Sequence, residues 1–271
     1  MAVSSTLGDY LRARRELIRP DEVGLPAGER RRVPGLRREE VALLAGISVE
    51  YYLRLEQGRD QHPSAQVLDS IANALCLDPD AAAYLHGLAR PLPAKRRRSP
   101  RPERVGTGVR DLIANWTTTP AYVQGRSAQV LAANPLAIAL SPHFAPGSNT
   151  LRAAFLEPEM RVFYRDWEEM TAKAVPYLRS VVGTDNDDPH LISLIGELSV
   201  GSERFRTLWA RHDVRYRTSG LTRMLHPQVG PLDLRYEKFA LPQAGQMLIT
   251  YHAGPGSESE QRLHLLAALA T

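Results

Sequence analysis

The spacing of apolar side chains in the first ninety residues predicts five short helices. Leu7, Leu11 and Ile18 recur near one face of the first helix. The fourth and fifth helices are each preceded by a residue that suits a helix N-cap, Ser64 and Asp78. A turn-rich basic segment with several prolines and glycines separates the first helix from the second. This pattern predicts an all-α domain at the N-terminus.

The second and third helices are expected at about 37–45 and 49–57, with a short turn between them. Gly46 lacks a Cβ and therefore suits a tight or left-handed turn, and Ser48 can cap the third helix. The residues expected to face inward are Val41, Leu44 and Ala45 on the second helix and Tyr52, Leu55 and Glu56 on the third. Two helices joined by such a turn are typical of a DNA-binding helix-turn-helix.

The opposite face of the third helix mixes polar and apolar side chains, which suits a surface that reads the major groove of DNA. That groove presents hydrogen-bonding base edges together with thymine methyl groups. The residues predicted to read bases are Val49, Glu50, Leu53 and Arg54. The residues predicted to contact phosphate are Arg37, Arg38, Ser48, Gln57 and Arg59. The alternative interpretation is an ordinary helical hairpin with a solvated charged face.

Three regions follow from the change of composition along the chain. Residues 1–90 form the helical domain, and the proline-rich basic stretch 91–108 is predicted to be a linker. The positive charge of this linker is either solvated or in contact with phosphate. The glycines at its end are assigned to the linker and not to the start of a helix. Residues 109–271 form a second domain.

The second domain is predicted to place helical segments between strands. Two strands and a short helix beginning near Asn134 come first, and long helical segments are expected at 157–183 and 188–214. A hairpin turning around 227–231, a further strand and a final helix complete the pattern. Strands followed by helices and again by strands indicate an α+β fold with a mainly antiparallel sheet.

Charge and composition narrow the class of protein. Residues 1–110 contain 19 Lys and Arg against 14 Asp and Glu, whereas the remainder contains 15 against 16. A basic first part beside a near-neutral second part suits contact with a polyanion through the first part alone. The sequence shows neither a membrane-length apolar run nor a secretion signal, and Cys76 is its single cysteine. We therefore expect a cytoplasmic protein without membrane contact.

Side chains that could carry catalysis or bind a metal do not form a recognisable motif. The histidines lack metal-site spacing, and neither a nucleophile elbow nor a phosphate-binding loop is present. We expect no enzyme activity, no metal and no cofactor. Aromatic and polar side chains of the long helical segments could line a small-molecule pocket, with core packing as the alternative. The candidate ligand contacts are Arg161, Tyr164, Arg165, Trp167, Phe205, Trp209 and His212.

The stretch "LRREEVALLAGISVEYYLRLEQG" resembles the helix-turn-helix of the Xre/Cro family, and the basic insertion before it narrows the resemblance to the MmyB-like regulators of actinobacteria. "VLAANPLAIAL", "RVFYRDWEE" and "HPQVGPLDLRYEKFALP" resemble the C-terminal domain of those regulators. The resemblance implies a lambda-repressor-like five-helix domain followed by a PAS-like domain that binds an apolar or fatty-acid-like ligand. It assigns base reading to Val49, Glu50 and Arg54, and phosphate contact to Arg38 and Gln57.

One departure from the Xre/Cro pattern concerns Leu43 and Leu53, which are apolar where such helices often carry a polar residue. Either side chain could serve a dimer contact or a thymine methyl contact. The sequence thus predicts a transcription regulator that binds a palindromic double-stranded DNA operator as a homodimer. A small apolar effector in the C-terminal domain would modulate its DNA binding. The alternative is a C-terminal domain that only dimerises or docks a partner protein, without a small ligand.

Overall fold

The contacts in the computed structural model divide the chain into two compact units that do not follow chain order. The first unit comprises Met1–Arg98, Val175–Asp187 and Arg206–Tyr216, and the second comprises Ser99–Ala174, Asp188–Phe205 and Arg217–Thr271. The structure describes residues 7–26, 31, 33–60, 62–89, 103–184, 188–214, 217–242 and 245–270. Most of the predicted linker, 91–102, lies outside these residues. The predicted boundaries at 90 and 108 stay a prediction.

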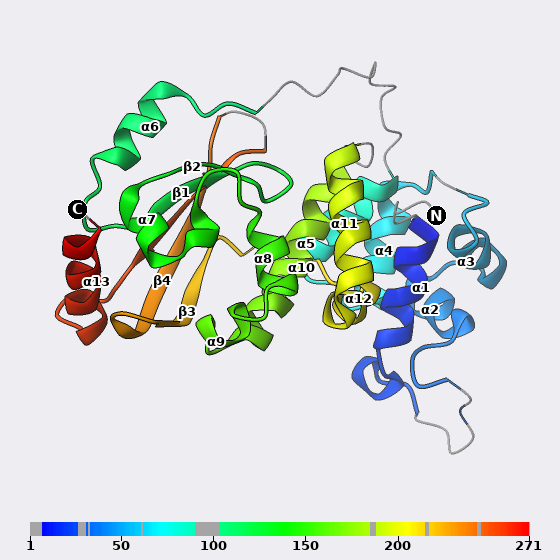
Figure 1. Cartoon of the computed structure of the whole chain (residues 1–271). Helices are drawn as coiled ribbons and strands as arrows, with labels where there is room; N and C mark the ends of the chain where they lie inside the picture. Colours follow the sequence, from blue (N-terminus) through cyan, green and yellow to red (C-terminus); the bar gives the residue numbers. More distant parts are fainter. Residues whose placement is uncertain are drawn as a thin grey trace. The chain divides into compact units, whose positions relative to one another are not determined.

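The N-terminal part of the first unit is helical, as predicted (Figure 1). Its described α-helices are α1 (Leu7–Leu17), α2 (Arg38–Ala45), α3 (Val49–Glu56), α4 (Ala65–Ala74) and α5 (Pro79–Ala89). Both expected N-caps are confirmed. The Ser64 hydroxyl accepts from the backbone N–H of Val67 at 3.3 Å, and the Asp78 carboxylate accepts from that of Ala81 at 2.9 Å.

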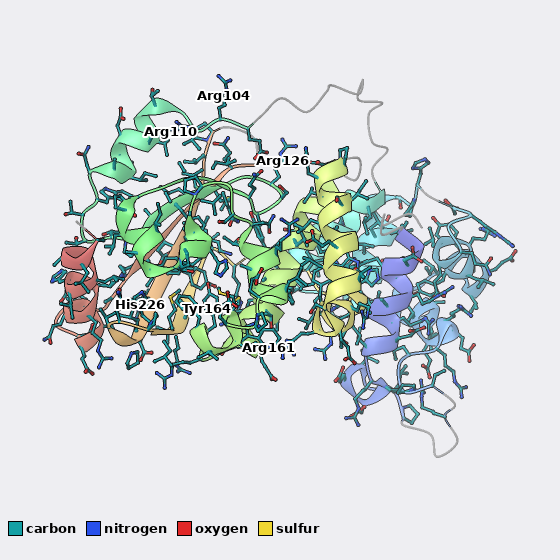
Figure 2. The ribbon with its side chains drawn as sticks, in the orientation of Figure 1. Arg104, Arg110, Arg126, Arg161, Tyr164 and His226 are labelled. Atoms are coloured by element: carbon teal, nitrogen blue, oxygen red, sulfur yellow. The ribbon has the colours of Figure 1, made fainter. Side chains whose placement is uncertain are left out.

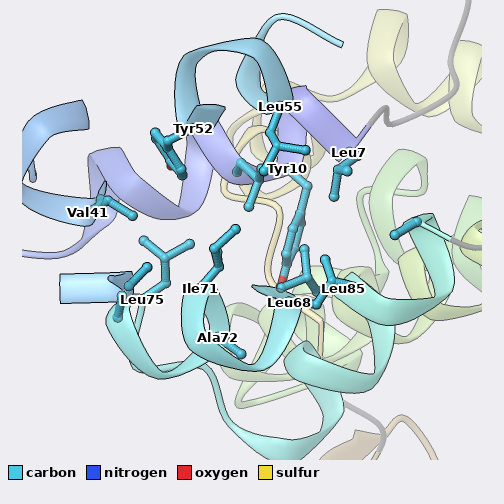
Figure 3. Packing of buried hydrophobic residues seen from close by; sticks show 14 of the residues in the cluster. Leu7, Tyr10, Val41, Tyr52, Leu55, Leu68, Ile71, Ala72, Leu75 and Leu85 are labelled. Atoms are coloured by element: carbon cyan, nitrogen blue, oxygen red, sulfur yellow. The ribbon is translucent and has the colours of Figure 1, made fainter. Parts of the chain in front are cut away.

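Apolar side chains from all five helices meet in one core (Figure 3). Tyr10, Leu11 and Leu55 are fully buried in it, and burial of each leucine side chain contributes about 1.5–3 kcal/mol. One predicted core position is wrong. Leu44 is 38% exposed, and Ala42 is buried in its place. The helix turns about 100° per residue, and α2 is rotated so that a small side chain faces its neighbours.

The second unit is built around an antiparallel sheet, which confirms the predicted α+β class (Figure 1). Its described strands are β1 (Ala121–Gln124), β2 (Val130–Ala133), β3 (Ser219–His226), β4 (Gly230–Ala240) and β5 (Met247–His252). The strand order is β2-β1-β5-β4-β3, so two distant parts of the chain join where β1 pairs with β5. Strands β3 and β4 form the predicted hairpin.

Side chains along the strands alternate between the two faces of this sheet. One face carries Tyr122, Tyr236 and Tyr251. Tyr236 is paired with Tyr251, and Tyr122 is paired with Ile249, two residues before Tyr251 on the same strand. The other face is covered in part by α6 (Thr107–Ala114), whose Ile113 packs with residues of β1 and β5. The sheet therefore has an aromatic face and an aliphatic face.

The predicted long helices of the second domain are each broken. The segment 157–183 contains α9 (Met160–Phe163) and α10 (Trp167–Thr184), because Tyr164 adopts extended backbone and pairs with Met224 of β3. The segment 188–214 contains two helices that Ser202 separates. These are α11 (Pro189–Gly201) and α12 (Glu203–Ala210). The apolar period continues through both breaks, so periodicity alone does not show them.

Two helices lie where none is predicted. Helix α6 begins at Thr107, inside the stretch assigned to the linker. Helix α8 (Thr150–Leu156) begins after Asn149, whose side chain accepts from two backbone N–H groups of the first turn. The final helix, α13 (Glu258–Leu269), is capped as expected by Ser257.

Asn134 ties the start of the short helix α7 (Pro135–Leu140) to the segment before β1. Its side chain is buried, and its amide shares its two hydrogens among the carbonyl oxygens of Ile113, Trp116 and Thr119. Its Oδ1 accepts from the backbone N–H groups of residues 121 and 137. One side chain thus satisfies five backbone groups, which fixes α6 and α7 on the sheet.

Among the described helices, none combines the length and apolarity that crossing a membrane requires.

Candidate nucleic-acid interface

The turn between α2 and α3 has the geometry that the sequence predicts. Gly46 has a φ of +65°, in the left-handed region, and its N–H closes the end of α2. Ser48 is the N-cap of α3, and its hydroxyl accepts from the Tyr51 N–H at 3.1 Å. Ile47, between them, is partly buried and packs against the helical core. The turn therefore sets the angle between the two helices with local backbone chemistry.

We expect Gly46→Ala to lower the free energy of unfolding of the helical unit by about 1–2 kcal/mol, because an L side chain is strained at this φ. Gly87→Ala, in α5, is the matched control. A Cβ would meet no atom within 4 Å at either position, and Gly87 is not among the glycines with positive φ. Gly87→Ala should therefore stabilise by up to about 1 kcal/mol. Urea unfolding checks both, and shifts of the same sign would contradict this account of the turn.

The inner face of α3 is fixed by a buried ion-pair cluster. Glu56 is 4% exposed, and its carboxylate accepts from two guanidinium nitrogens of Arg15 at 3.1 and 2.7 Å. Arg38 of α2 donates to the second carboxylate oxygen. Tyr52 and Leu55 fill the remainder of this face and are fully buried. The predicted inward positions of α3 are confirmed, and the helix cannot rotate about its axis without breaking this cluster.

The outer face of α3 presents the predicted base-reading residues to solvent. Val49 is 47% exposed, and the side chains of Glu50 and Arg54 are 84% and 44% exposed. Leu53 is partly buried. Arg54 lies 3.5 Å from the Glu50 carboxylate and stacks over the Tyr51 ring at 5.5 Å. The helix thus offers a cation, a carboxylate and apolar surface side by side.

The predicted phosphate contacts lie at the ends of α2 and α3. Arg37 is the N-cap residue of α2, Ser48 is that of α3, and Gln57 is the C-cap residue of α3. Arg59 is exposed just beyond it. Arg38 differs from the others because it also holds Glu56, so its guanidinium has a structural partner as well as an exposed part.

One contact of the basic insertion was not predicted. Arg31 forms a bidentate ion pair with Glu40 of α2, at 2.7 and 2.6 Å, and also donates to the Gly35 carbonyl. The hydrogen bonds from Arg31 lower the pKa of the Glu40 carboxyl, and the Arg37 N–H contributes less. An arginine and a glutamate nine residues apart across a turn-rich segment leave no periodic signal, so sequence patterning could not find the pair.

The candidate ligand contacts fall in both units. Trp209 and His212 belong to the first unit, whereas Arg161, Tyr164, Arg165, Trp167 and Phe205 belong to the second. Within the second unit, the guanidinium of Arg161 stacks over the Trp167 ring at 4.9 Å, and Arg165 lies 3.9 Å from the Asp233 carboxylate. Tyr164 follows α9 directly and is buried (Figure 2).

The positions of Tyr164 and His212 differ from the helical stripes that the sequence suggests. Tyr164 pairs with a strand, and His212 lies beyond α12 with a φ of +52°. The period of four between Phe205 and Trp209 is retained in α12. Both departures occur at helix ends, where side-chain spacing no longer indicates a shared face.

An aromatic group on the sheet was missed. Phe144 stacks on Tyr122 at 4.8 Å and on Tyr251 at 5.7 Å between ring centroids. Tyr164 and Tyr251 lie within hydrogen-bonding reach, and burial raises the pKa of Tyr251 to about 12. The alternation of "AYVQ" and "MLITYH" shows which side chains share a face within each strand, but not the register that places Tyr122 and Tyr251 on one face. It could not have shown that a third aromatic ring covers them.

His226 illustrates why isolated histidines are poor guides to a catalytic or metal site. Its Nε2 donates to the Ala139 carbonyl at 3.0 Å, and its Nδ1 accepts from backbone N–H groups of the β3–β4 turn (Figure 2). The hydrogen bonds of this buried ring hold the turn between β3 and β4. Within the described residues, no group of three or more His, Cys, Asp or Glu side chains is arranged to hold a metal ion.

The fold and the exposed face of α3 define a helix-turn-helix DNA-binding protein with a separate α+β domain. A family model for a helix-turn-helix domain matches residues 6–85, and one for the MmyB-like transcription regulator ligand binding domain matches residues 105–266. The chain belongs to the MmyB-like transcription regulators, and the predicted type of regulator is confirmed. A search of curated proteins found no match.

Proposed function

We propose that this DNA-binding regulator acts as a homodimer on a palindromic operator and that a small apolar effector modulates its affinity. The observation that carries the proposal is the orientation of α3. Its inner face is held by the Glu56 ion pairs, while Val49, Glu50 and Arg54 remain exposed. A dimer would place two such helices about 34 Å apart, one turn of DNA, on the two half-sites.

Support for an apolar effector comes from the second unit. The family model names a ligand-binding domain, and one face of the sheet is lined by stacked aromatic rings. Sites for small molecules are mostly apolar with a few placed polar groups, which the hydroxyls of Tyr164 and Tyr251 could supply. A fatty-acid-like molecule combines the same two properties. DNA and effector would then affect one another's binding reciprocally.

The test is native mass spectrometry of the purified full chain, followed by operator titration with and without a saturated long-chain fatty acid. We expect a retained small molecule and a change of at least about fivefold in operator affinity, the lower end of typical allosteric coupling. Equal affinities in the presence of verified bound fatty acid would exclude this effector role.

A second candidate is a docking or dimerisation role for the α+β domain without a small ligand. It is favoured by the outer face of β3 and β4, where Leu221, Leu225 and Phe239 are 44%, 40% and 51% exposed. Exposed apolar side chains on neighbouring strands are typical of protein contacts. A chain that carries no small molecule, but loses its dimeric state when Phe239 is replaced by Ser, would support this candidate instead.

A further inference from the structure

Two segments of the ligand-binding domain are built into the first unit. The family model for that domain covers residues 105–266, yet residues 175–184 and 206–214 group with the DNA-binding helices by their contacts. Val214 is 4% exposed and belongs to the same apolar cluster as the helical core. The core of the DNA-binding unit is therefore completed by residues from the other domain of the sequence.

Arg179 of α10 is the most deeply buried charged side chain at this place. It is 1% exposed, it stacks on the Trp209 ring at 3.9 Å, and it donates to the Trp209 carbonyl. A second nitrogen donates to Nδ1 of His212 at 3.0 Å. Its Nε is buried without a hydrogen-bond acceptor in the described structure. Burial lowers the pKa of the guanidinium, but an arginine stays charged in any case.

His212 lies between Arg179 and the helical core. The centroid of its ring is 6.4 Å from that of Tyr10, which is fully buried. The Tyr10 ring in turn packs against the Tyr84 ring, with 5.2 Å between centroids. Burial, and after it the charge of Arg179, lowers the pKa of His212 to about 4. The imidazole is therefore neutral at pH 7, which leaves its Nδ1 able to accept from Arg179.

The same segment is tied to α1 by an ion pair. Arg14 donates to the carboxylate of Asp213 at 2.6 Å, with 17% and 41% of the two side chains exposed. Tyr10 and Arg14 lie one turn apart on α1. Helix α1 is thus in contact with residues 209–214 both in the core and at the surface.

Helix α10 belongs to both units. Its residues up to Ala174 are counted with the second unit, and those from Val175 onward with the first. Pro176 lies at this change, inside the helix. Proline has no N–H to donate to the carbonyl four residues earlier, so helices bend most readily at such a position. A displacement of the first half of α10 would reach Arg179 within one turn.

We propose that Arg179 is the coupling residue through which the ligand-binding domain adjusts the DNA-binding helices. The hydrogen bonds of this buried cation to Trp209 and His212 are to neutral groups, and the cation gains hydration when its contact opens, so the closed contact is only moderately favoured. Such a contact is readily shifted by the free energy of effector binding. The coupling role rests on the proposed effector function, whereas the closed contact itself does not depend on it.

The first test is hydrogen exchange, followed by mass spectrometry, on the full chain and on Arg179→Met. We expect peptides of α1 and of 206–214 to exchange about tenfold faster in the variant, because a hydrogen bond to a charged group is lost at their contact. Exchange in the sheet should not change. Unaltered exchange in α1 would overturn the proposal.

Arg204→Met is the matched control. Arg204 also stacks on a tryptophan, Trp167, at 5.3 Å, and also donates to a backbone carbonyl, that of Glu168, but all three residues belong to the second unit. Its replacement should leave α1 unchanged. If Arg179→Met does not fold, Asp213→Asn removes the neighbouring ion pair to Arg14, which joins α1 to the same segment. It should accelerate the same two peptides, and no acceleration there would also overturn the proposal.

The second test separates coupling from simple stabilisation. Operator affinity is measured for wild type and Arg179→Met with and without a saturated long-chain fatty acid. We expect the ratio of the two affinities to fall to about one in Arg179→Met and to be retained in Arg204→Met. A ratio retained in Arg179→Met would overturn the coupling role. If the operator affinity of the wild-type chain does not change with fatty acid, the effector proposal fails. The hydrogen-exchange experiment then tests the Arg179 contact on its own.

Discussion

Replacing Glu56 with alanine is expected to lower the free energy of unfolding of the DNA-binding helices by about 3–5 kcal/mol. Glu56 accepts two hydrogen bonds from Arg15 and one from Arg38, and Arg15 is itself only 7% exposed. The variant therefore keeps a buried guanidinium that has lost its carboxylate partner. Urea unfolding, with amide exchange in α1 and α3 to localise the loss, measures the effect.

Glu50→Ala is the control for this prediction because it removes a carboxylate from the opposite face of the same helix. The Glu50 side chain is 84% exposed, so its loss should change stability by no more than about 0.5 kcal/mol. Replacing both buried partners, Arg15→Met with Glu56→Leu, should recover much of the stability lost in Glu56→Ala. Equal losses in Glu56→Ala and Glu50→Ala would show that the buried cluster does not hold α3.

Arg54→Ala is expected to weaken binding to the preferred operator by about 1–3 kcal/mol and to relax the base preference at one position of each half-site. Arg54 is exposed, stacks over Tyr51 and lies 3.5 Å from the Glu50 carboxylate. This arrangement orders the guanidinium before it meets a base edge. Fluorescence titration against the operator and its single-base variants measures both effects.

Arg59→Ala is the matched control for a phosphate contact. It should weaken binding to every duplex alike and reduce the slope of affinity against salt concentration by about one. Arg38→Ala is predicted to act in the same way but is less informative, because Arg38 also donates to Glu56. If Arg54→Ala behaves like Arg59→Ala, the base-reading face has been assigned to the wrong side chains.

The helix-turn-helix could be predicted from sequence because its determinants are local. A glycine at a left-handed turn, a serine N-cap and an apolar period within eight residues each involve only residues close together in the sequence. Two contacts that were not predicted depend on residues outside this local pattern. Ala42 replaces Leu44 in the core because the choice depends on the neighbouring helix, and Arg31 finds Glu40 across a segment without regular structure.

The second unit was predicted less completely because its decisive contacts are distant in sequence. Tyr164 leaves the helical period to pair with Met224, and β1 pairs with β5 across more than a hundred residues. The division of α10 between two units leaves no compositional mark. The candidate ligand contacts, chosen by helical spacing, therefore stay a prediction, and Arg179 could be recognised only from its burial.

The most direct test of the DNA-reading face is selection of duplexes from a random library by the full chain and by Arg54→Ala. We predict that the wild-type chain enriches one palindromic sequence, with half-sites about one helical turn apart. The variant should enrich the same sequence with one symmetric position randomised. Failure of the folded wild-type chain to enrich any sequence, or an unchanged motif in Arg54→Ala, would contradict the reading of DNA by the outer face of α3.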